Sequence, residues 1–209
     1  MIRLWMLCLC CWVMPVQAAD SLPQPLLQGL ETLAQVHGFS CKFKQVLSYD
    51  DGSQQVFEGT LAVARGGHFR WAYHQPYEQL YVSNGHDIWF YEPDLMQAQH
   101  LTSLDAIDPM AMRLLEGRVS ADEIRVLSEE MEGQQTVYHI QLGAETVLWL
   151  ALDAQSLPIW FETRDALGNR NRMNLLSLQT GQPDMHRFEF KVPTGVDILD
   201  AQGRMMEQR

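Results

Sequence analysis

Hydrophobic residues recur every three or four positions early in the chain. Between residues 26 and 34 they form one apolar stripe, with Pro25 just before it and Gly38 shortly after it. Spacing of this kind is typical of an amphipathic helix, and proline and glycine commonly mark where a helix starts and ends. The pattern therefore predicts a helix over residues 25–37.

After Gly38 the period of the pattern changes to two. Phe39, Cys41 and Phe43 alternate with polar residues, as in a strand that buries one face. The dipeptide Asn84-Gly85 separates two later runs and is a strong signal for a tight hairpin. Strand-forming runs of this kind predict strands at residues 39–43, 57–63, 69–73, 79–83, 88–91, 136–142, 146–152, 158–164, 170–178 and 187–192.

The middle of the chain breaks this series of strands. Asp108 is a suitable N-cap, Pro109 fits the first helical position, and Gly117 is a suitable stop. The apolar residues between them predict a second, short helix over residues 110–116.

About ten short strands joined by short turns favour antiparallel neighbours in one sheet. Two helices are too few to cover both faces of such a sheet, which is expected to curl and to use the helices over its open side. We therefore predict a mainly β fold, in which a curved antiparallel sheet forms an incomplete, half-open β-barrel with a helical lid and encloses a cavity.

Aromatic side chains are concentrated between residues 69 and 91, and methionines lie in the second predicted helix. An ordinary β-sheet core also needs aromatic residues, but a curled sheet with few helices leaves apolar surface to face a ligand. We expect the cavity to be lined by Phe69, Trp71, Trp89, Met110 and Leu114.

The N-terminus has the layout of a secretory signal peptide. Arg3 precedes an apolar run that ends near residue 16, and small residues follow at Ala18 and Ala19. The run is shorter than the roughly 20 residues that a membrane-spanning helix needs. We predict a signal peptide at residues 1–18 and one domain at residues 19–209, with cleavage after Ala19 as an alternative. Three of the four cysteines lie in the signal, and Cys41 is interpreted as a small apolar residue on a strand.

The chain is acidic, with a formal net charge of −11, which becomes −12 when the signal and its single arginine are removed. This charge disfavours nucleic acid and anionic membranes as direct partners and suits a soluble protein, which we expect to be a monomer.

Signals for catalysis are weak. The seven histidines show no metal-ligand spacing, and no nucleophile elbow or phosphate-binding glycine loop occurs. His68 and His74 are more simply interpreted as solvated, and Glu92 and Asp94 as turn residues. We expect no enzymatic activity, no cofactor and no bound metal.

Three segments together resemble the LolA family of periplasmic lipoprotein carriers. They are residues 59–71, which include Leu61-Ala62-Val63-Ala64-Arg65, residues 82–93, and residues 188–197. The opening helix followed by Phe43-Lys44-Gln45 matches as well, and in order these pieces cover nearly the whole chain beyond the predicted signal. The resemblance implies a half-open barrel with a helical lid in the periplasm. It also implies that lipoprotein acyl chains are taken from an inner-membrane ATP-binding cassette complex and passed to an outer-membrane receptor lipoprotein. It assigns to Arg65 a latch that bonds to backbone carbonyls of the lid helix.

One departure leaves alternatives open. The family usually has proline after this arginine, whereas this chain has Gly66-Gly67, which predicts a more flexible loop. A specialised LolA-like paralogue that carries lipid for a dedicated pathway is one alternative, and a non-catalytic periplasmic sensor of lipids or lipoproteins is another. Arg65 is also compatible with a plain surface arginine.

Overall fold

The computed structural model describes residues 22–102, 113–114, 116–143 and 146–206. The predicted signal peptide lies outside these residues. The elements in chain order are α1 (Gln24–Gln35), β1 (Gly38–Ser48), β2 (Gln54–Ala64), β3 (His68–Gln75), β4 (Gln79–Asn84), β5 (Ile88–Glu92), η1 (Pro93–Leu95), β6 (Gln97–Leu101), η2 (Ala121–Glu123), β7 (Ile124–Glu132), β8 (Gln135–Leu142), β9 (Thr146–Leu152), β10 (Pro158–Arg164), β11 (Arg170–Thr180), η3 (Met185–Phe188) and β12 (Asp197–Leu199).

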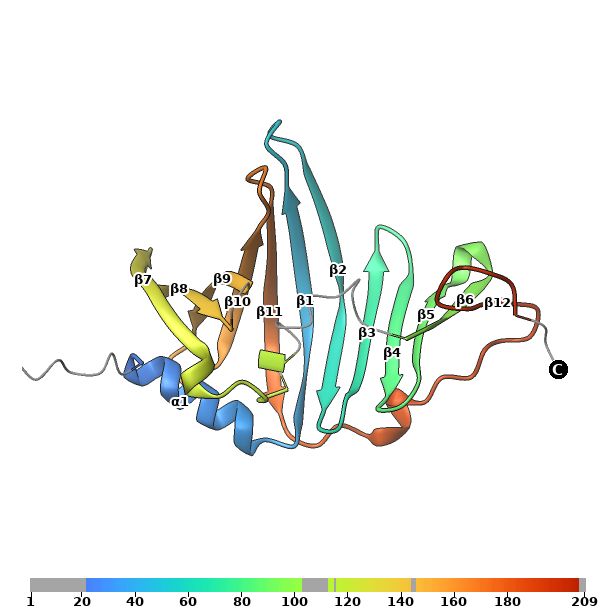
Figure 1. The fold of residues 1–209 in the computed structure, drawn as a ribbon, viewed down its shortest axis with the longest axis horizontal. Helices are drawn as coiled ribbons and strands as arrows, with labels where there is room; N and C mark the ends of the chain where they lie inside the picture. The colour runs from blue at the N-terminus through green and yellow to red at the C-terminus, as the bar shows by residue number, and fades with distance from the viewer. Residues whose placement is uncertain (1–21, 103–112, 115, 144–145, 207–209) are drawn as a thin grey trace, which may run out of the picture.

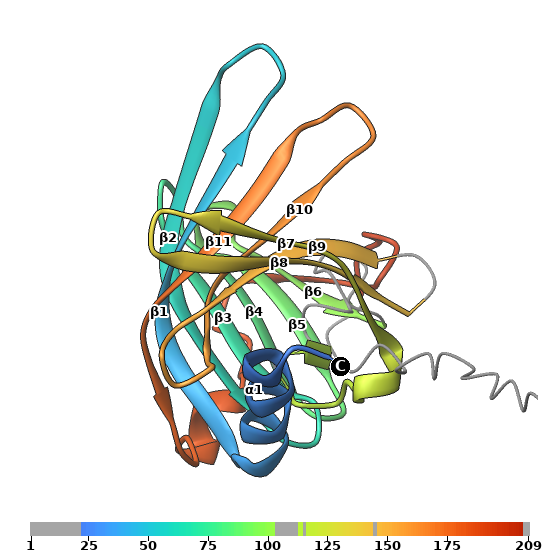
Figure 2. The same cartoon turned by 90° about the vertical axis from the view of Figure 1, so that its left-hand side faces the viewer.

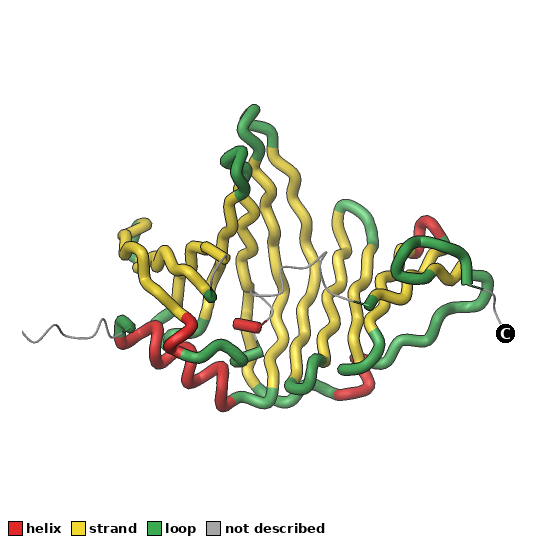
Figure 3. The backbone as a smooth tube through the Cα atoms, viewed as in Figure 1, coloured by secondary structure: helices red, strands yellow, loops and turns green. Residues whose placement is uncertain are grey.

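The strands form one 12-stranded sheet in the order β12-β6-β5-β4-β3-β2-β1-β11-β10-β9-β8-β7. Neighbours are antiparallel except for β12, which pairs with β6 in parallel. The order has two ends, at β7 and β12, so the sheet does not close into a barrel (Figures 1 and 3). The predicted mainly β, half-open architecture is confirmed.

Strand β1 joins the two halves of the chain. It pairs with β2 along its whole length, from Gly38 opposite Ala64 to Ser48 opposite Gln54, and with β11 on its other side. Each half is otherwise a series of hairpins, β2 to β6 and β7 to β11. In Figure 2 strands β7–β9 pass in front of β3–β5, with α1 at the lower end, so the sheet wraps around the side on which the helix lies.

The two faces of the sheet differ in what they pack against. We call the inner face the one whose side chains form a single cluster with the buried leucines of α1. Alternation along each strand puts every second residue there, for example Leu61 and Val63 on β2 and Phe69 and Trp71 on β3. Burial of this cluster is the main apolar contribution to the fold.

The outer face is partly covered by the chain itself. Phe188, in η3, packs on Ala62 and Ala64, and Phe190 contacts the rings of Trp89 and Tyr91. The predicted strand at residues 187–192 is therefore wrong. Its alternating apolar residues instead contact the outer face from a segment that leaves η3 without joining the sheet there.

Farther along the outer face, a polar and aromatic layer replaces an apolar surface. The Glu162 carboxylate is buried and accepts from Nε of both Arg164 and Arg172, at 2.9 and 2.8 Å. These two guanidinium groups lie 3.9 Å above the rings of Trp149 and Trp160, respectively. The charged groups on the outer face of β9–β11 are thus paired with one another and packed on aromatic rings.

The second predicted helix is described only at its end. Residues 113–114 are helical, and Arg118 N and Gly117 N donate to the carbonyls of Arg113 and Leu114 at 2.9 and 3.0 Å. With Gly117 at a φ of 65°, these bonds form the glycine stop of a helix. The predicted end at Gly117 is confirmed, whereas residues 108–112, with Met110, lie outside the described residues. Among the described residues no helix is long and apolar enough to cross a membrane.

Candidate functional site

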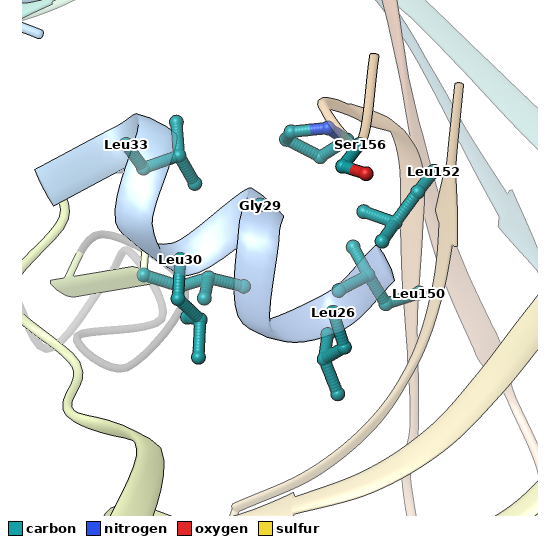
Figure 4. A pocket seen from close by; sticks show the side chains of 9 residues that line it. Leu26, Gly29, Leu30, Leu33, Leu150, Leu152 and Ser156 are labelled. Carbon is teal, nitrogen blue, oxygen red and sulfur yellow. The ribbon is translucent and has the colours of Figure 1, made fainter. Parts of the chain in front are cut away.

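Helix α1 lies over the inner face and encloses a small apolar pocket against β9 and β10. The pocket has an empty volume of about 240 Å³, part of which is open to solvent. Figure 4 shows Leu26 of the helix near Leu150 and Leu152 of β9, with Ser156 in the turn that follows. The residues that line it are Leu26, Gly29, Leu30, Leu33, Leu114, Leu150, Leu152, Ser156 and Pro158.

Leu114 was predicted as a cavity residue and lines this pocket. The leucines of α1 were visible in the sequence as a helical stripe. Leu150 and Leu152 were visible only as strand residues, because their position under the helix depends on pairing between distant strands.

Two glycines let the backbone of α1 approach its neighbours closely. A Cβ at Gly29 would lie 2.4 Å from the carbonyl oxygen of Ser156, and one at Gly117 would lie 2.3 Å from that of Leu33. Real Cβ contacts are never this short, so only glycine fits at either place. The middle of the helix is thereby held against the β9–β10 turn, and its last turn against the end of the second helical segment.

Arg65, in the loop between β2 and β3, binds the C-terminal end of α1. Its Nε donates to the carbonyl of Val36 at 3.0 Å, and its Nη2 donates to the carbonyl of Ala34. The last carbonyls of a helix lack partners within the helix, and the partial negative charge there favours a cation. The last turn of α1 has no basic residue of its own. Arg65 supplies both the donors and the charge from the sheet.

The loop that carries Arg65 has a conformation that depends on glycine. Gly66 and Gly67 have φ values of 85° and 80°, and Nδ1 of His68 donates to the Arg65 carbonyl at 2.9 Å. Proline, which fixes φ near −65°, could not occupy position 66 in this conformation. The glycine pair therefore gives this loop a backbone conformation that a loop with proline after the arginine could not adopt.

Aromatic side chains extend the inner face away from the helix. Phe69 and Trp71, both predicted as cavity residues, are buried in the same cluster as Leu26 and Leu30. Phe43 makes edge contacts with Trp71 and with Tyr73, at centroid distances of 5.8 and 5.1 Å. Burial raises the pKa of Tyr73, whose hydroxyl donates to Gln45 at 3.0 Å. This area is continued by the stacked rings of Tyr81 and Phe90.

Trp89 does not belong to this surface, so the prediction that placed it in the cavity is wrong. It pairs with Val82 and packs, with Leu80 and Phe190, in an outer-face cluster. Residues 88–91 are all apolar or aromatic, so alternation alone could not show which of them face inward.

Few groups of the described residues suit catalysis or metal binding. His68 is bonded to a backbone carbonyl, and Nε2 of His74 lies 3.3 Å from the Thr60 hydroxyl. No group of three or more His, Cys, Asp or Glu side chains that could hold a metal ion occurs in the part of the chain that the structure describes.

Cys41 lies in the inner-face cluster and is the one cysteine expected to remain after signal cleavage. Burial raises the pKa of its thiol from 9.0 to about 12. The folded state thus favours the neutral thiol, which contributes to stability below pH 9 and loses this contribution as the pH rises toward 12. A thiol reagent should not label the native mature protein at pH 9, but should label it in denaturant. Labelling of the native protein that rises with a midpoint near pH 9 would contradict the burial.

Several known proteins are similar to this chain. A family model described as outer membrane lipoprotein carrier protein LolA matches residues 34–191. An outer-membrane lipoprotein carrier protein from Bordetella bronchiseptica is 31% identical over 195 residues, covering 90% of this chain and 92% of the relative. One from Methylococcus capsulatus is 29% identical over 200 residues, covering 92% and 94%. The crystal structure of an uncharacterized conserved protein from Thermus thermophilus superposes with a TM-score of 0.55 at 11% identity, covering 85% of this chain and 98% of that one, and thus shares the fold.

Proposed function

Because the chain belongs to the LolA family of outer membrane lipoprotein carrier proteins, we propose that it holds the acyl chains of lipoproteins on the inner face of its sheet, beneath α1. The observation that carries this proposal is the contact between α1 and the inner face. Leu26, Leu30 and Leu33 cover an apolar surface that is itself continued by aromatic side chains. The family is one of carriers, a role that needs no catalysis.

The structure has the helix closed over the site. Pockets for drug-sized ligands usually enclose roughly 300–1,000 Å³, whereas only about 10 Å³ beneath α1 is accessible to a water-sized molecule. Acyl chains must therefore displace the helix. Each leucine that leaves the sheet then gives up about 1.5–3 kcal/mol of burial, and the bonds from Arg65 break.

Such competition suits a carrier. Each buried methylene contributes about 0.8 kcal/mol, so an open site of full size would bind a diacyl anchor too tightly to release it. The apparent affinity for the ligand is the intrinsic affinity multiplied by the fraction of molecules that are open, so a mostly closed protein binds more weakly. When α1 closes, its leucines are buried again on the inner face, and this favours release of the ligand without an energy source at the carrier.

The proposed route follows from the family. In the periplasm, the protein would receive lipoproteins from an inner-membrane ATP-binding cassette complex and pass them to an outer-membrane receptor lipoprotein. Its acidic charge suits docking onto basic surfaces of these partners.

Binding of a fluorescent acylated peptide to the purified mature protein tests the proposal. Leu30→Asp puts a charge on the buried side of α1, so it should disfavour the closed form and raise the apparent affinity for the peptide. Gln28→Asp, on the exposed side of the same helix, is the matched control and should bind like the wild type. A folded wild-type protein that binds no acylated peptide would refute the proposed function.

The conformation of Gly66 and Gly67 favours one second candidate, a specialised paralogue that serves a dedicated lipid pathway. Depletion of the protein in cells separates the two. Lipoproteins stranded at the inner membrane indicate a general carrier, whereas normal sorting indicates the paralogue.

A further inference from the structure

The indole nitrogen of Trp71 is a buried hydrogen-bond donor without a partner among the described residues. Its Nε1 is inaccessible to solvent and makes no hydrogen bond to any of them, and the whole residue is only 6% exposed. Leaving such a donor unpaired costs about 1–3 kcal/mol, and native proteins rarely do so without a reason.

Trp71 is distinguished from the other two buried side chains with an unpaired polar atom among the described residues. Glu116 lies beside the guanidinium of Arg118, and the ring of His139 stacks on Trp149 of the outer face. Only Trp71 lies within the inner-face cluster, between Leu61 of β2 and Tyr81 of β4 in the sheet register.

The surroundings of Trp71 offer little that the donor could use. Tyr73, whose ring stacks on that of Trp71 at a centroid distance of 6.2 Å, donates its hydroxyl hydrogen to Gln45, and its oxygen accepts no bond from the indole. The ring of Phe43 stands edge-on at an interplanar angle of 75°, and an N–H contact with an aromatic ring is a weak substitute for a hydrogen bond. The indole N–H can only donate, so a full hydrogen bond at Trp71 requires an acceptor oxygen from outside these surroundings.

We propose that Trp71 Nε1 donates to an acyl carbonyl, ester or amide, of the bound lipoprotein. This inference rests on the proposed function and deepens it. Within a fatty acyl group the hydrocarbon has no acceptor, so the carbonyl oxygen is the one atom that can pair with the indole. The bond would fix the boundary between hydrocarbon and polar head at Trp71. The protein would then bind acylated cargo more tightly than cargo with alkyl groups of equal length.

Three synthetic probes with one common peptide separate the possible carbonyls. The first is a cysteine peptide with a diacylglyceryl group in ester linkage. The second has the same chains in ether linkage and an N-palmitoyl amide. The third has ether-linked chains and a free amino terminus, and so no acyl carbonyl. Each is added to mature protein labelled with nitrogen-15 at tryptophan, and the Trp71 indole resonance is identified with Trp71→Phe.

We expect a downfield shift of the Trp71 indole proton with the first probe, the second probe or both, and none with the third. Trp71→Phe should weaken binding of the shifting probe about 5- to 10-fold more than it weakens binding of the third probe. Trp89→Phe, on the outer face, is the matched control and should change neither affinity.

Failure of the proposed function and failure of the role of Trp71 give different results. Wild-type protein that binds none of the probes would overturn the proposed function together with this inference. Protein that binds all three probes, with no difference in the Trp71 resonance between carbonyl and ether forms, would overturn the inference alone. The resonance is measured in wild-type protein, so this result does not depend on how Trp71→Phe folds.

Discussion

Replacing Gly29 by alanine is expected to lift α1 off the sheet, although alanine is the better helix former. In an isolated helix this change would be stabilising by about 1 kcal/mol. Here the new Cβ would lie 2.4 Å from the carbonyl oxygen of Ser156. That oxygen belongs to a turn held by bonds between Asp153 and Leu157 and between Ser156 and Asp153. The helix is therefore the part that moves.

The displacement should appear in two measurements. With a net cost of about 2 kcal/mol from overpacking, Tm should fall by about 4–8 °C. Labelling of Cys41 by a thiol reagent should also speed up about tenfold or more, because its burial depends on the inner-face cluster to which α1 contributes.

Gln28→Ala is the matched control, since it changes an exposed position of the same helix and meets no close neighbour. It should leave both Tm and the labelling rate close to wild type. A rise in Tm for Gly29→Ala would mean that helix propensity outweighs the clash and that α1 is not held by this contact.

Alternation of apolar residues predicted most strands and the half-open sheet, since one buried face produces the same pattern in every antiparallel strand. It failed where the pattern has another cause. Strand β7 was missed because its second half, which includes Glu129, Glu130 and Glu132, is polar at the edge of the sheet. Residues 187–192 alternate because Phe188 and Phe190 pack on the outer face of a sheet they do not join there.

The candidate site was predictable in kind but only partly in detail. Phe69 and Trp71 alternate clearly, so their shared face followed from the strand. The face on which Trp89 lies could be determined only from the register of β4 with β5, in which Trp89 pairs with Val82. The pocket itself combines a helix at the start of the chain with strands more than a hundred residues later, and no local pattern contains that information.

Removing the guanidinium of Arg65 should favour the open form and make the carrier retain its ligand. Arg65→Met keeps the length of the side chain but loses both bonds to the end of α1. Arg65 is exposed, so these charged bonds together contribute about 1–2 kcal/mol after solvent screening. That corresponds to about a tenfold shift in the ratio of open to closed molecules.

A shift toward the open form acts on binding and on release in opposite ways, and this separates a latch from a surface arginine. Because apparent affinity scales with the open fraction, Arg65→Met should bind acylated peptide about tenfold more tightly and transfer it more slowly to acceptor vesicles. Arg65→Lys keeps the charge near the helix end without the planar fork, so its affinity and transfer rate should fall between those of the wild type and Arg65→Met.

Arg187→Met is the matched control. Arg187 is exposed and its guanidinium makes no hydrogen bond among the described residues, so this variant should behave like the wild type. Equal affinity and equal transfer rates for Arg65→Met and Arg187→Met would show that the bonds to Ala34 and Val36 do not govern closure. Closure would then depend on the leucines of α1 and on the close contact at Gly29.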